Sequence, residues 1–179
     1  IGDQRNKLGH LTDVIKAGLI GNLADYRLND HLGNSVMARD IQFRGQNLGY
    51  AATTNETVNY ASAHDGYTLW DSLNAKLPFY TPGRAPATAT AFERASVQRL
   101  ILATVLVSQG FTFIEGGSEI LRSKGGDQDS YDSGDWFNRL DFTLRSDNWG
   151  QGLPPAWKNG GDVSFWAPRL NSIPSPSPA

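Results

Sequence analysis

A strand–helix–strand pattern over residues 57–114 is the feature that most restricts the fold of this chain. Apolar side chains at every second position from Val58 are typical of a short strand. Residues 90–108 are apolar on most sides of a helix, which predicts a helix buried by its neighbours. A second short strand is expected at residues 111–114. Two strands joined through a helix are expected to be parallel, with a right-handed crossover, so the chain contains a unit of an α/β fold.

Polar, glycine-containing loops follow both expected strands. His64 and Asp65 come directly after the first strand, and the loop of residues 115–138 follows the second. Since the carboxyl ends of parallel strands meet at one edge of a sheet, and ligands bind there in α/β barrels, the His-Asp pair is a candidate functional pair. A structural hydrogen bond between the two side chains is the other interpretation of the pair.

Local signals predict further elements. Residues 9–18 place an apolar stripe on one side of a helix, and residues 67–77 are expected to form a short helix. Thr90 and Glu93 fit a capping box at the start of the longer helix. Residues 19–56 have weak periodicity, so we expect a long loop with one or two short elements.

Composition excludes several classes of protein. The net charge of −2 argues against binding to nucleic acid or to anionic membranes, which requires a basic surplus. No stretch approaches the ~20 apolar residues of a membrane span, and no signal-peptide pattern opens the chain. Without cysteine there can be no disulfide and no thiolate zinc site. Because the sequence starts at Ile1 rather than Met, we expect a piece of a longer protein.

Several stretches resemble signature regions of the pullulanases and limit dextrinases, the debranching enzymes of the α-amylase superfamily. These stretches are residues 17–26, 58–65, 68–71, 106–110, 117–124 and 129–138. Residues 148–155 (Asn-Trp-Gly-Gln-Gly-Leu-Pro-Pro) are similar to plant-type limit dextrinases in particular. The resemblance runs in order from about residue 1 to about residue 170.

The resemblance implies an α/β fold, the C-terminal portion of a (β/α)8 TIM barrel with long loops. A complete barrel takes about 250 residues, whereas this chain has 179, so the barrel would be incomplete in this chain. Residues 1–170 would be the partial catalytic barrel domain. Residues 171–179 are a Pro/Ser-rich tail that we expect to be disordered.

The resemblance also implies an activity, the hydrolysis of α-1,6-glucosidic bonds in pullulan and branched limit dextrins with retention. Retention needs two carboxyl groups about 5–5.5 Å apart, a nucleophile and an acid/base. Asp65 matches neither; it matches a third carboxylate, which stabilises the transition state, and His64 matches a residue that binds the same sugar ring. The nucleophile motif (Gly-x-Arg-x-Asp) and the later acid/base Glu do not occur here. The isolated chain is therefore expected to be inactive.

The loop of residues 122–138 would wall the glucan groove in such an enzyme. Asp129 is the further substrate-binding candidate that the resemblance implies. Trp136 is another candidate, because an indole can stack on a sugar face, and core packing is the other interpretation of this tryptophan. Two positions depart from the pattern: Gln128 stands where relatives often have Arg, and Gly66 where they usually have Asn.

The acidic residues of this loop have two other interpretations, a solvated loop or a calcium site. They are Asp127, Asp129, Asp132 and Asp135. No cofactor is required for the expected chemistry, and calcium stays open.

The expected partners are an α-glucan substrate and the remainder of the same enzyme's barrel, with no nucleic acid and no membrane. Part of a barrel alone would expose strand edges and apolar faces. The resemblance to plant-type enzymes implies a plastid location. The alternative is a non-catalytic glucan-binding or assembly chain, which lacks the nucleophile and acid/base.

Overall fold

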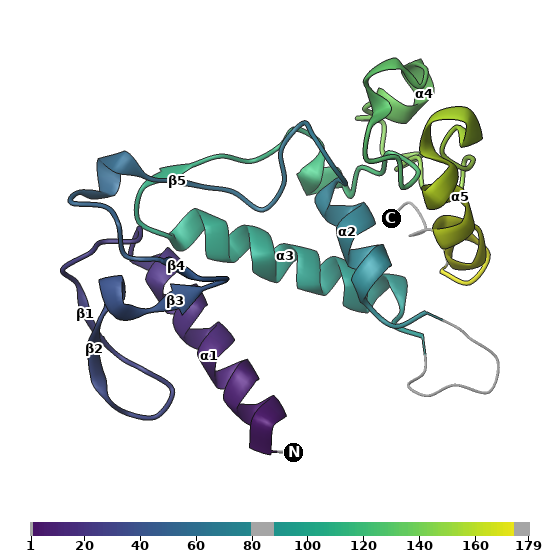
Figure 1. The fold of residues 1–179 in the computed structure, drawn as a ribbon. Coiled ribbons are helices and arrows are strands. Elements are labelled where there is room, and N and C mark those ends of the chain that lie inside the picture. The colour runs from purple at the N-terminus through teal and green to yellow at the C-terminus, as the bar shows by residue number, and fades with distance from the viewer. Residues whose placement is uncertain (1, 80–87, 174–179) are drawn as a thin grey trace. The chain divides into compact units, whose positions relative to one another are not determined.

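The computed structural model describes residues 2–79 and 88–173 (Figure 1). The helices are α1 (Gly2–Leu19), α2 (Leu69–Lys76), α3 (Ala91–Val107), α4 (Asp135–Asn138) and α5 (Ala156–Leu170). The strands are β1 (Arg27–Asn29), β2 (Ser35–Met37), β3 (Gln42–Phe43), β4 (Gln46–Asn47), β5 (Val58–Asn59) and β6 (Phe111–Thr112).

The chain divides into two compact units. Unit 1 comprises residues 1–60 and 103–113, and unit 2 comprises residues 61–102 and 114–179. In the part of the chain that the structure describes, no helix has the length and apolar character to cross a membrane.

Helix α1 begins unit 1 and confirms the helix expected at residues 9–18. The helix starts at Gly2, earlier than expected. Its first turns are polar and carry no apolar stripe, so the hydrophobic pattern did not predict them. Asp3 in the first turn and Lys16 in the last turn interact favourably with the helix dipole. The helix ends where Gly21 and Asn22 take positive φ angles of 68° and 53°.

Two antiparallel hairpins and two 3₁₀ turns (residues 38–40 and 54–56) lie in the expected long loop, which therefore holds more short elements than the one or two expected. Strands β1 and β2 pair with Leu28 opposite Val36. Strands β3 and β4 are joined by Arg44 and Gly45, whose φ angles of 52° and 79° suit a tight two-residue turn. Strands of two or three residues are too short to show a period in the sequence.

Strands β5 and β6 confirm the parallel pair expected from the strand–helix–strand pattern. Val58 lies opposite Phe111, and the Phe113 amide donates to the Asn59 carbonyl at 2.9 Å. The expected extent of the first strand was wrong, because β5 ends at Asn59 and His64 lies beyond it in a bend. Within the described residues, β5 pairs only with β6, so no second ladder extends it.

Helix α3 starts with the expected capping box. The Thr90 amide donates to Glu93 Oε2 at 2.7 Å, and the Glu93 amide donates to Thr90 Oγ1 at 3.2 Å. The prediction that neighbours bury most of this helix was wrong, since Leu106 and Val107 are exposed. The described residues cover only part of its apolar surface.

Unit 2 has a tryptophan core. Trp70, Trp149 and Trp166 are buried together with Ile173, and the rings of Trp149 and Trp166 meet edge to face at 5.6 Å. Helix α2 confirms the short helix expected at residues 67–77.

Helix α5, which supplies Trp166, was not predicted from the sequence. Gly160 and Gly161 lie near its start and Pro168 near its end. These residues obscure a helical pattern, because glycine and proline weaken helices.

The expected tail of residues 171–179 lies only partly within the described residues. Ile173 is buried in the tryptophan core, and its carbonyl accepts a hydrogen bond from Trp149 Nε1 at 3.1 Å. Residues 174–179 lie outside the described residues.

Candidate functional site

His64 and Asp65 lie in an exposed turn of unit 2. His64 Nδ1 is 3.2 Å from Asp65 Oδ1, and the two side chains are 88% and 93% exposed. An ion pair this exposed contributes little to stability. Both side chains are accessible to a ligand in solution.

The backbone of this turn is tied to the loop that follows β6. Lys124 Nζ donates to the His64 carbonyl at 3.1 Å and to the Gly66 carbonyl at 2.9 Å. The Gly66 amide donates to the Gln128 carbonyl at 3.0 Å. The two polar loops that the sequence placed after the two strands therefore lie together in unit 2.

Asp129 follows in the same loop, at the start of a 3₁₀ turn of residues 130–132. Its amide donates to Asp127 Oδ1 at 2.8 Å, and its half-exposed carboxylate has Oδ2 at 3.5 Å from Lys158 Nζ. Lys158 also pairs with Asp132. Sequence reasoning missed Lys158, because the lysine lies on the unpredicted helix α5.

Trp136 lies on α4 and is partly buried. Its ring centroid is 3.6 Å from that of Phe137, with the planes tilted by 34°. A Cβ atom at Gly152 would lie 3.1 Å from its ring, so Gly152 gives the indole its space. The residue is 37% exposed, so part of its aromatic surface is accessible to solvent.

Three of the four acidic residues of the loop, Asp127, Asp129 and Asp132, have partners other than a metal ion. Asp127 is buried, and its Oδ1 accepts hydrogen bonds from the Asp129 amide and from Asn159 Nδ2. Asp129 and Asp132 face the Lys158 ammonium. Among the described residues, no group of three or more His, Asp or Glu side chains could hold a metal ion.

A buried carboxylate, that of Asp71, accepts hydrogen bonds from the loop that follows β6. Asp71 Oδ1 accepts a hydrogen bond from Ser123 Oγ at 2.6 Å, and Oδ2 accepts one from the Lys124 amide at 2.8 Å. Asp71 is fully buried, and this burial raises its pKa despite the hydrogen bonds. The three residues lie in two of the stretches that resemble pullulanase signature regions, but no local pattern in the sequence predicted the contact between these stretches.

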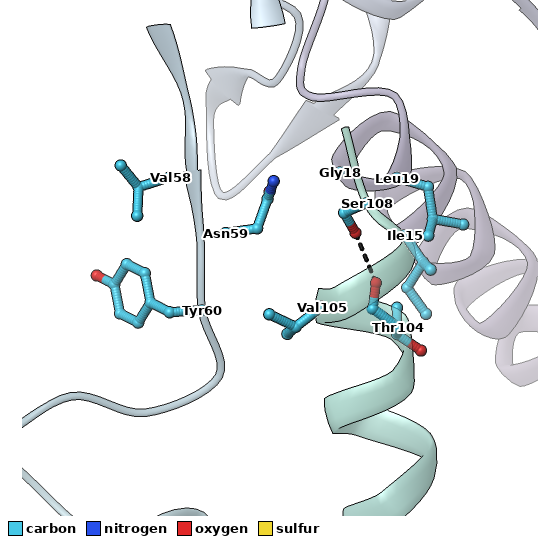
Figure 2. A pocket seen from close by; sticks show the side chains of 9 residues that line it. All are labelled: Ile15, Gly18, Leu19, Val58, Asn59, Tyr60, Thr104, Val105 and Ser108. Carbon is cyan, nitrogen blue, oxygen red and sulfur yellow. Dashed lines mark hydrogen bonds between the residues drawn. The ribbon is translucent and has the colours of Figure 1, made fainter. Parts of the chain in front are cut away.

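Unit 1 carries an apolar groove of about 240 Å³ (Figure 2). Ile15 and Leu19 of α1, Val58 and Tyr60 at β5, and Val105 of α3 line it with smaller polar residues. No carboxylate or histidine lines the groove. It therefore lacks the pair of carboxyl groups that glycoside hydrolysis uses, and we do not assign it to catalysis.

A second pair of His and Asp residues lies in unit 1. Asp13 on α1 is buried, and its Oδ2 lies 2.5 Å from His31 Nδ1. The same oxygen accepts a hydrogen bond from the His31 amide at 3.1 Å. His31 Nε2 is 2.9 Å from Asn6 Oδ1. Both ring nitrogens thus have partners, and the contacts tie the β1–β2 turn to α1.

Comparison with known proteins identifies the relatives of the chain. A pullulanase from Klebsiella aerogenes is 40% identical over 167 residues, which are 93% of this chain and 14% of that protein. The chain is homologous to the pullulanases. Pullulanase 1, chloroplastic, from Arabidopsis thaliana is 42% identical over 157 residues, which are 87% of this chain and 15% of that protein. No protein-family model matches the chain.

A solved pullulanase has the same fold over the shared region. The structure of Klebsiella pneumoniae pullulanase complexed with maltotriose matches with a TM-score of 0.84 and 39% sequence identity. The match covers 94% of this chain and 15% of that pullulanase chain. The resemblance to pullulanases is therefore confirmed, and the chain spans about one seventh of the length of these relatives.

Proposed function

We propose that this chain is part of a starch-debranching glycoside hydrolase that cleaves α-1,6-glucosidic bonds in pullulan and branched limit dextrins with retention. The observation that carries the proposal is the exposed turn of His64 and Asp65, held against the loop of Asp129 in a chain homologous to pullulanases. The maltotriose bound in the solved pullulanase supports an α-glucan as the substrate class.

Asp65 is the proposed transition-state stabiliser. Its carboxylate accepts hydrogen bonds from sugar hydroxyls, and these bonds strengthen as positive charge develops on the ring in the oxocarbenium-like transition state. His64, 3.2 Å from the carboxylate, supplies a hydrogen-bond donor to the same ring. Because both side chains are exposed, a substrate can reach them from solution.

Asp129 and Trp136 are the proposed substrate-binding residues of the second loop. Oδ2 of Asp129 faces Lys158, so Oδ1 is the oxygen that would accept a hydrogen bond from a sugar hydroxyl. The exposed part of the Trp136 indole would stack on a glucose face. The proposal requires no cofactor.

The proposed partner of this chain is the remainder of a (β/α)8 barrel, with residues 1–170 forming the C-terminal portion of the catalytic domain. Apolar side chains on β5, on β6 and just after these strands are exposed: Val58, Tyr60, Phe111 and Phe113. An exposed apolar two-stranded parallel sheet is unusual, because parallel sheets are normally covered on both faces. Further strands and helices of the barrel would cover it and would supply the nucleophile and the acid/base.

The plant-type assignment and the plastid location are narrower proposals. They are supported by the chloroplastic Arabidopsis relative and by the resemblance of residues 148–155 to limit dextrinases. Bacterial pullulanases are about as similar to this chain. Imaging of the fluorescently tagged full-length protein in plant cells tests the location, and an exclusively extraplastidic signal would contradict it.

The release of maltotriose from pullulan by the full-length protein tests the proposed activity. We expect activity in the wild type and its loss in Asp65→Ala with the melting temperature unchanged. A full-length protein that binds pullulan without hydrolysing it would instead support the non-catalytic glucan-binding chain. Full activity in Asp65→Ala would remove Asp65 from the proposed mechanism.

A further inference from the structure

We infer that Lys124 is a positioning residue for Asp65; this inference rests on the proposed function. Lys124 is buried, with 2% of its surface exposed. Its ammonium donates to the carbonyls of His64 and Gly66, the residues on either side of Asp65. A single charged group thus holds the backbone on both sides of the proposed transition-state stabiliser.

The Asp65 side chain is placed mainly by its own backbone. The side chain is 93% exposed, and the His64 side chain next to it is 88% exposed, so packing restrains the Asp65 carboxylate little. The Gly66 amide, bound to the Gln128 carbonyl, is the third backbone restraint on the turn. The direction in which the Asp65 carboxylate points therefore depends on these hydrogen bonds.

Lys124 is itself firmly anchored. Its amide donates to the buried Asp71 carboxylate, which also accepts from Ser123. Asp71 lies in the first turn of α2, where its amide is capped by Thr68 Oγ1 at 3.1 Å. The turn is thus connected, through one lysine, to the start of a helix in the same unit.

Burial makes the ammonium costly to keep charged, and it lowers the pKa of Lys124. The carboxylates of Glu115, Asp71 and Asp127 act in the opposite direction, whereas the Arg122 cation adds to the lowering. Ion–dipole hydrogen bonds to two carbonyls offset part of this cost. A methionine would fill the same space without the donors, so Lys124→Met isolates what the ammonium does.

The test compares Lys124→Met with Lys76→Met in the full-length protein. Lys76 is an exposed lysine at the end of α2, which makes it a matched control in the same unit. We expect Lys124→Met to lower kcat on pullulan about 100-fold, the loss that a displacement of about 1 Å can cause. KM should change less than about threefold, since the other proposed contacts with the substrate, those of Asp129 and Trp136, remain. Lys124→Arg, which keeps the charge, should recover part of kcat.

Amide hydrogen exchange of residues 62–68 gives a second readout that needs no activity. We expect exchange at least about tenfold faster in Lys124→Met, because the variant loses both hydrogen bonds from the charged ammonium, and no change in Lys76→Met. If Lys124→Met does not fold, Lys124→Gln carries the same two measurements, with the same direction expected.

The two proposals fail in different ways. Wild-type kcat in folded Lys124→Met, or unchanged exchange of residues 62–68, would overturn the role of Lys124 and leave the debranching proposal intact. A wild-type protein without debranching activity, or an active Asp65→Ala variant, would overturn the proposed function instead. A lower melting temperature with unchanged kcat would show that Lys124 is purely structural.

Discussion

The Ser123 hydroxyl donates a hydrogen bond to Asp71 Oδ1 at 2.6 Å, and both residues are fully buried in unit 2. This bond connects the loop after β6 to helix α2. The two residues lie far apart in the sequence, in two of the stretches that resemble pullulanase signature regions, and no local pattern indicates that they are in contact.

Ser123→Ala should destabilise unit 2 by about 1–3 kcal/mol, because one oxygen of a buried carboxylate loses its donor. All five tryptophans lie in unit 2, so tryptophan fluorescence during urea unfolding reports on this unit. Ser164→Ala, at an exposed hydroxyl on α5, is the control and should change stability by less than about 0.5 kcal/mol. Equal unfolding midpoints for the two variants would contradict the structural role of the Ser123–Asp71 bond.

Asp13→Asn should weaken the attachment of the β1–β2 turn to α1 at neutral pH. Burial raises the pKa of Asp13, but hydrogen bonds from His31 and Lys16 outweigh it and hold the pKa below 3.8. A lowered pKa means that the ionised form contributes stability above pH 3.8, and that this contribution is lost as the pH falls through the lower folded value.

Amide exchange of residues 26–37 between pH 3 and pH 7 measures this effect. We expect faster exchange, corrected for intrinsic rates, in Asp13→Asn at pH 7 and a smaller difference from wild type at pH 3. Asp3→Asn, at an exposed pair with Lys7, should behave like wild type. A difference that grows toward low pH would refute the assignment.

Gly126→Ala should destabilise unit 2 more than Gly150→Ala does. Both glycines have positive φ angles, 77° and 74°, so backbone strain is similar in the two variants. A Cβ at Gly126 would collide with the Trp166 ring, whereas a Cβ at Gly150 has nothing within 4 Å. We expect a difference of about 1–3 kcal/mol, the usual cost of overpacking, between their unfolding free energies. Equal losses would mean that strain alone accounts for both.

Asp129→Asn should raise KM for pullulan in the full-length protein about tenfold, the equivalent of about 1.4 kcal/mol, with kcat within about twofold. The reason is that the carboxylate is proposed to bind sugar hydroxyls without acting on the reacting bond. Asp132→Asn is the matched control, because Asp132 also pairs with Lys158 but is not proposed to bind substrate. An equal rise in KM for the control would assign the effect to Lys158 rather than to Asp129.

Local patterns in the sequence predicted those elements whose cause is local. The Thr90–Glu93 capping box places the start of α3, and the apolar repeat of residues 67–77 predicts α2. The strand–helix–strand order led to the parallel pairing of β5 with β6, because a crossover connection leaves few alternatives. The motifs shared with pullulanases also identified the relatives of the chain correctly.

The sequence by itself thus determined the central α/β unit, the family resemblance and the candidate residues His64, Asp65, Asp129 and Trp136. Only the tertiary structure decided what holds those residues: the Lys124 ammonium on the turn, the buried Asp71 that accepts from the Lys124 amide and Lys158 beside Asp129. These contacts join residues that are far apart in the chain, and each depends on how helices and loops pack. A hydrogen bond between distant residues leaves no periodic or local signal, because its energy appears only when folding brings the two groups together.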